Sequence, residues 1–78
     1  MKKLTEGKLY AIIDARTAVN MKTGKFIVIP NNSTVMYIKT IKNSTKKSNL
    51  RTFQILYGSG VYSLNTGMKI HSVFKELD

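Results

Sequence analysis

The chain has 78 residues, of which 13 are Lys or Arg and four are Asp or Glu, so its formal net charge at pH 7 is +9. It contains one His and no Cys, which excludes disulfides and thiolate metal sites and leaves few groups for acid–base chemistry. We therefore expect a non-enzymatic binding module with no catalytic residues, metal, cofactor or small-molecule substrate, and with a surface that attracts polyanions.

The length predicts a single domain over residues 1–78. Apolar residues make up 42% of the chain, which is typical of a folded protein rather than a disordered basic tail. The longest apolar runs, 9–13 and 26–29, are too short for a signal peptide or a membrane span, so we expect a cytoplasmic protein without a membrane role. The preference for Lys over Arg also fits an AT-rich genome, which would explain part of the charge.

The first half of the chain predicts strands separated by turns. Residues 8–14 alternate, with Leu9, Ala11 and Ile13 on one face. Residues 15–33 form a long excursion that contains a turn signal at 22–25, a β-branched run at 26–29 and a tight turn at 30–33. Residues 34–42 then give the clearest long strand.

The second half predicts a hairpin and one final element. After a polar loop at 43–49, residues 50–57 alternate cleanly, and Gly58 and Gly60 suit a tight turn before a short strand at 61–64. Residues 68–77 fit a strand to about residue 75. The spacing of Ile70, Val73, Phe74 and Leu77 also suits a short amphipathic helix.

The order of these elements resembles the SH3-like small β-barrel. Residues 4–7, which lead into the first strand, and the hairpin sequence at 51–64 carry the resemblance. It implies an all-β barrel of about five strands with a long first loop, a three-strand meander and a short turn before the last strand. Recognition of Pro-rich peptides is not expected, because the 15–33 excursion contains one aromatic residue, Phe26, and no acid after Asp14. Such barrels bind nucleic acid or protein in ribosomal, transcription-associated and phage proteins, and the fold does not choose between them.

A nearly closed sheet has one interior, which takes one face of each strand. The pattern of 34–42 does not decide which of its two faces points inward. The predicted core consists of Leu9, Ala11, Ile13, Val28, Met36, Ile38, Phe53, Ile55, Leu64, Ile70 and Phe74.

The polar loop 43–49 is the sharpest candidate site. Lys46 and Lys47 lie within it, and Lys42 and Arg51 flank it. Together with Lys39, these cations would bind backbone phosphates without reading bases. The alternative is a solvated hairpin connection whose lysines keep the domain soluble.

Tyrosines near basic residues form a second candidate. Tyr10 and Tyr37, with Tyr57, would stack bases if they shared the outer face, and Tyr10 is the best exposed candidate. The alternative places them in the barrel wall with their hydroxyls at the rim. Arg16 either pairs locally with Asp14 or reaches outward to an anion, and His71 is expected on the surface of a strand.

Two functions follow from these features. The first is a nucleic-acid-binding module of low sequence selectivity that contacts DNA or RNA phosphates. The alternative is a protein-interaction module, such as a small phage or mobile-element protein, that docks on an acidic host protein. The oligomeric state is left open. The candidate binding residues in either case are Lys39, Lys42, Lys46, Lys47, Arg51, Tyr10, Tyr37 and Arg16.

Overall fold

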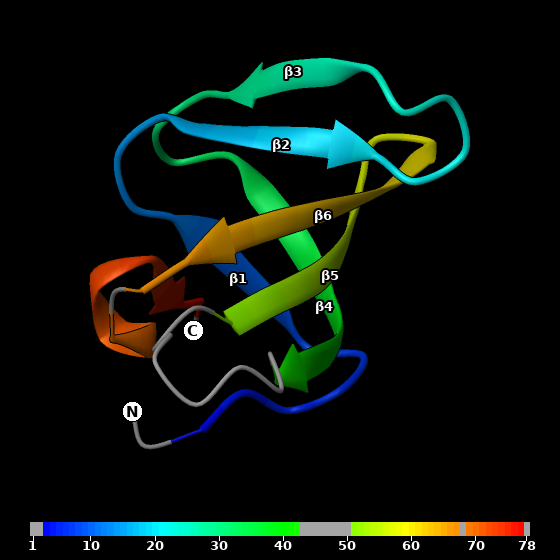
Figure 1. The fold of residues 1–78 in the computed structure, drawn as a ribbon. Helices are drawn as coiled ribbons and strands as arrows, with labels where there is room; N and C mark the ends of the chain where they lie inside the picture. The colour runs from blue at the N-terminus through cyan, green and yellow to red at the C-terminus, as the bar shows by residue number, and fades with distance from the viewer. Residues whose placement is uncertain (1–2, 43–50, 68, 78) are drawn as a thin grey trace.

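In a computed structural model, which describes residues 3–42, 51–67 and 69–77, the chain forms one curled antiparallel sheet (Figure 1). Its seven strands lie in the order β3-β2-β6-β5-β4-β1-β7. The all-β prediction is confirmed. The strands are β1 (Leu9–Ile12), β2 (Arg16–Asn20), β3 (Phe26–Ile29), β4 (Thr34–Lys42), β5 (Arg51–Tyr57), β6 (Gly60–Thr66) and β7 (Phe74–Glu76), with a 3-10 turn η1 (Ile70–Ser72) before β7.

The expectation of about five strands is wrong, because the 15–33 excursion is itself a hairpin. Asn20 builds its turn: the side-chain oxygen accepts hydrogen bonds from the backbone N–H groups of Lys22 and Thr23, at 2.8 and 3.0 Å. Gly24 follows with a φ of 75°, which glycine adopts without strain. The resulting β2–β3 pair joins the sheet through β6.

Within 69–77 the amphipathic helix is absent and the predicted strand is present but short. A single 3-10 turn over Ile70–Ser72 precedes a strand of three residues, so the strand begins later than the alternation indicated. β7 then pairs with β1, which brings segments near the two ends of the chain side by side (Figure 1). Among the described residues, no helix is long and apolar enough to cross a lipid bilayer.

Aromatic side chains occupy the centre of the core. Phe74 makes edge-to-face contacts with Tyr10 and Phe53, with ring centroids 6.0 and 5.3 Å apart. The rest of the core comes from the inner faces of the strands. The buried apolar cluster consists of Tyr10, Ile12, Ala18, Ile29, Val35, Tyr37, Phe53, Ile55, Leu64, Val73 and Phe74.

The predicted core is correct on β5, β6 and β7 and wrong on β3, where Ile29 is buried and Val28 is exposed. On β1, Tyr10 and Ile12 point inward and Leu9 is exposed. Both strands carry apolar residues on two faces, so alternation alone does not choose the inner one. Ala11, Phe53, Ile55, Leu64 and Phe74 are buried as predicted, whereas Ile13, Met36, Ile38 and Ile70 are half-buried.

A pair of Phe→Ala substitutions tests this assignment of inside and outside. Phe53 is fully buried and Phe26 is 72% exposed. Phe53→Ala should lower the free energy of unfolding by about 3–5 kcal/mol, because it leaves a cavity in the core. Phe26→Ala should change it by less than about 0.5 kcal/mol. Chemical denaturation of the two variants measures both values, and equal losses would contradict the described packing.

Candidate functional site

Tyr10 and Tyr37, two of the three tyrosines that would stack bases from a shared outer face, lie instead in the wall of the curled sheet, the alternative considered above. Tyr10 is completely buried, and its hydroxyl accepts a hydrogen bond from the Thr5 backbone N–H at 2.8 Å. Tyr37 is also buried, with its hydroxyl 2.6 Å from that of Thr40. The expected exposure of Tyr10 is therefore wrong. A ring inside the core cannot stack on a base, which removes the proposed platform on the outer face.

Arg16 holds two parts of the fold together. Its Nε donates to the carbonyl of Ile13 at 3.0 Å, and one terminal nitrogen donates to the carbonyl of Ser72 at 2.9 Å. Ser72 belongs to η1, so the guanidinium links the corner between β1 and β2 to the turn that precedes β7. Charged donors make strong bonds to carbonyls, and this geometry gives Arg16 a structural role.

The predicted basic cluster is divided by the pairing of β4 with β5. Lys39 and Arg51 are both exposed. Lys39 pairs with Gln54, which lies three positions from Arg51. Side chains alternate between faces, so Lys39 and Arg51 project to opposite sides of the sheet. Lys46 and Lys47, with the loop 43–49, lie outside the described residues, as does the side chain of Lys42.

The outer face of the sheet carries a row of apolar side chains across four neighbouring strands and the residue that follows β2. The pairing registers place Leu9 opposite Met36, Met36 opposite Leu56, and Leu56 opposite Val61. The N–H of Met21 then donates to the carbonyl of Val61 at 2.9 Å, which extends the row beside the end of β2. Directly paired residues share a face, so these five side chains form a continuous belt, called here the outer row.

The outer row is accessible to a partner. Leu9 is 49% and Met21 is 50% exposed at its two ends, and Val61 is exposed between them. Met36 and Leu56 are half-buried in the middle. Single exposed apolar residues are ordinary, but a continuous series that crosses the sheet is typical of an interaction surface.

Lysines lie on both sides of the outer row. One neighbouring row, two positions along the strands, consists of Lys75, Ala11 and Thr34. The row on the other side begins at Lys39 and ends at Phe26 on β3. Its full pairing runs Lys39, Gln54, Ser63, Val19 and Phe26. The outer face therefore presents an apolar belt between Lys39 and Lys75, both of which are exposed.

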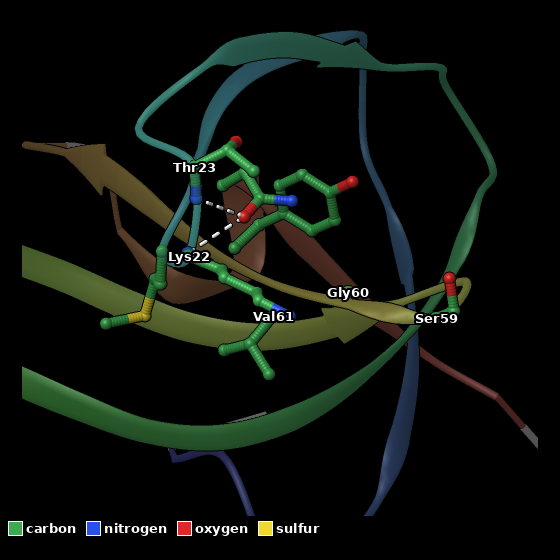
Figure 2. Close-up of a pocket in the computed structure, with 8 residues that line it drawn as sticks. Lys22, Thr23, Ser59, Gly60 and Val61 are labelled. Carbon is green, nitrogen blue, oxygen red and sulfur yellow. Dashed lines mark hydrogen bonds between the residues drawn. The ribbon is translucent and has the colours of Figure 1, made fainter.

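A hollow of about 470 Å³ lies at one end of the outer row, between the β2–β3 turn and the β5–β6 turn (Figure 2). Met21 and Val61 line it together with Lys22. The Asn20 oxygen in its wall is already bonded to two backbone N–H groups of the turn (Figure 2). The hollow is thus an indentation between two hairpin tips. Lys22 in its wall places a cation at this end of the outer row.

The described residues contain no group of three or more His, Cys, Asp or Glu that could hold a metal ion. The acids that they include are Glu6, Asp14 and Glu76. Glu76 lies 3.6 Å from the Lys8 ammonium, in an ion pair between two exposed side chains.

Comparison with known proteins finds no match to this chain among family models, curated proteins or solved structures. The sequence does not predict the outer row, because alternation places Leu9 and Met36 in the core. The one available signal was that 8–14 and 34–42 carry apolar residues on both faces, which leaves a surplus for the surface.

Replacing Arg16 or Lys39 with Met, in separate variants, distinguishes a cation with a structural role from a cation on the surface. Arg16→Met should lower the free energy of unfolding by about 1–3 kcal/mol, because the carbonyls of Ile13 and Ser72 lose a charged donor. Lys39→Met removes the same charge from an exposed strand position and should change stability by less than about 0.5 kcal/mol. Thermal and urea unfolding provide the measurement. Similar stabilities for the two variants would rule out the structural role of Arg16.

Proposed function

We propose that this chain is a small non-enzymatic module that docks on an acidic protein through the outer face of its sheet. The observation that carries the proposal is the outer row itself, a belt of apolar side chains bracketed by Lys39 and Lys75. Protein interfaces commonly combine an apolar centre with a polar or charged rim.

Charge selects the kind of partner. The net charge of +9 favours association with an acidic surface and opposes association with a second copy of this chain. Lys39 and Lys75, on either side of the outer row, would raise the association rate and orient the partner. Burial of the apolar belt would then supply most of the affinity.

We also propose that the fold is an SH3-like barrel. The five strands β7-β1-β4-β5-β6 are adjacent in that order, which supports a meander closed by the last strand beside the first. The β2–β3 hairpin stands in the place of the long first loop, and η1 supplies the short turn before β7. This resemblance concerns architecture and carries no partner with it.

Binding to nucleic acid is the second candidate function. It is favoured by the exposed cations. In the described part of the chain an ion pair is seen for Lys8, with Glu76, which leaves other exposed cations to contact phosphates. Lys3, Lys22, Lys25, Lys39, Arg51, Lys69 and Lys75 are exposed. Such charges would bind phosphates in a strongly salt-dependent manner. The buried positions of Tyr10 and Tyr37 remove the stacking contribution on which this candidate also relied.

Affinity capture with a serine-substituted outer row tests the docking proposal. The tagged chain is used as bait in a nuclease-treated lysate, and the captured protein is then purified for titration calorimetry. The double variant Leu9→Ser with Val61→Ser should weaken binding of that protein at least about tenfold, because it removes exposed apolar contact area from the outer row. Both positions are exposed, so the fold should be retained.

Ile41→Ser is the matched control, because Ile41 is an exposed apolar residue of β4 outside the outer row. It should leave affinity within about twofold. Equal binding by the double variant and the control would contradict docking through the outer row. Disappearance of every partner after nuclease treatment, with oligonucleotide affinity that falls steeply with salt, would favour the second candidate instead.

A further inference from the structure

We propose that the free edge of β3 receives an extended acidic segment of the partner protein as an added antiparallel strand. The inference rests on the proposed docking function and specifies the partner's chemistry and its mode of binding. β3 is the terminal strand of the sheet, with β2 as its neighbour and no strand of the described chain beyond it (Figure 1). Its outer edge is therefore open to a strand from another chain.

The register shows which backbone groups face that edge. The N–H of Asn20 donates to the carbonyl of Lys25 at 2.8 Å, so these two residues form a hydrogen-bonded pair. Hydrogen-bonded and non-hydrogen-bonded pairs alternate along an antiparallel ladder. The next pair, Val19 with Phe26, is consequently non-hydrogen-bonded, and so is Thr17 with Val28. The N–H and C=O groups of Phe26 and Val28 thus point away from β2.

The side chains of the same two residues are the most accessible apolar groups at this edge. Phe26 is 72% and Val28 is 61% exposed, both on the outer face. Ile27 packs against the core and Ile29 is buried, so the intervening positions anchor β3 from inside. An added strand would find backbone groups that face the open edge and apolar side chains at the same positions, on a strand that Ile27 and Ile29 hold against the core.

The opposite edge of the sheet lacks this combination. β7 has three residues, and its Lys75 and Glu76 are exposed and charged. Proteins commonly protect sheet edges with short strands and charged side chains, which deter pairing with another chain. β3 has four residues and all four are apolar, Phe26, Ile27, Val28 and Ile29. Lys25 and Pro30 limit it at its ends, so the pairing segment would be short.

The flanking charges indicate an acidic occupant. Lys25 precedes β3 and Lys22 lies in the same turn, and both are exposed. In the alternation of the strand, Lys25 shares the side of Ile27, whereas Phe26 and Val28 point to the outer face. A segment that alternates acidic and apolar residues would therefore place carboxylates beside Lys25 and apolar side chains beside Phe26. A second copy of this chain would instead bring another charge of +9 to the edge.

A defined peptide tests the inference before any partner has been identified. The blocked peptide Glu-Val-Glu-Val-Glu-Val-Glu is titrated into the full chain, and backbone amides are followed by NMR and hydrogen exchange. The amides of Phe26 and Val28 should become protected at least tenfold, while those of Ile27 and Ile29, already bonded to β2, change little. The same peptide with Lys in place of Glu should bind at least tenfold more weakly. Absence of amide shifts over 25–29 at millimolar acidic peptide would overturn the inference.

Two substitutions at one position separate backbone pairing from side-chain contact. Val28→Pro removes an N–H that faces the open edge and breaks no bond to β2, so the fold should persist and peptide binding should fall at least tenfold. Val28→Thr keeps the N–H and the branched shape, and should stay within threefold of the unchanged chain. Equal affinities of the two folded variants would overturn strand addition.

The partner captured by the outer row separates this inference from the proposed function. Undiminished binding of that protein to Val28→Pro, with loss on substitution of the outer row, would leave the docking function standing and reject the β3 edge as part of it. Sedimentation of the full chain tests the remaining possibility, that a second copy of this chain occupies the β3 edge. A dimer that Val28→Pro converts to a monomer would assign the edge to a second copy and overturn the acidic segment.

Discussion

The burial of Tyr10 is the constraint on which the arrangement of this molecule depends. Adjacent positions of a strand face opposite sides, so placing Tyr10 inside puts Leu9 outside. The register of β1 with β4 then carries the same choice to Met36, and that of β4 with β5 carries it to Leu56. The bond from the Thr5 N–H makes burial of the tyrosine hydroxyl tolerable, because an unpaired polar group in the core would be costly.

The β2–β3 hairpin gives the sheet its asymmetry. Arg16 holds the corner before β2 to the segment before β7, and the Asn20 turn directs β3 back along β2. The hairpin therefore extends the sheet past β6 instead of covering the core as a loop. As a result, one edge of the sheet ends in apolar Phe26 and Val28 and the other in charged Lys75 and Glu76.

Charge and apolar surface have separate tasks in the proposed interaction. The net charge acts over roughly 8–10 Å at physiological salt, which is enough to attract an acidic partner but gives little positional precision. The outer row and the β3 edge act at contact distance, where apolar burial and backbone pairing fix orientation. Lys39 and Lys75 lie beside the outer row and Lys25 lies at the start of β3, so attraction and contact would operate next to one another.

The sequence by itself determined the all-β character, the strand at 34–42, the glycine hairpin and the inward positions of Phe53, Ile55 and Leu64, because clean alternation and turn residues are local signals. The charge also follows from composition alone. The inner faces of β1 and β3, and the membership of β2 and β3 in the sheet, required tertiary pairing. Segments such as 9–13 and 26–29 are apolar on both faces, and contacts with distant strands choose between them. The outer row requires three pairings between distant segments, in addition to the local pairing of Leu56 with Val61 across the β5–β6 turn.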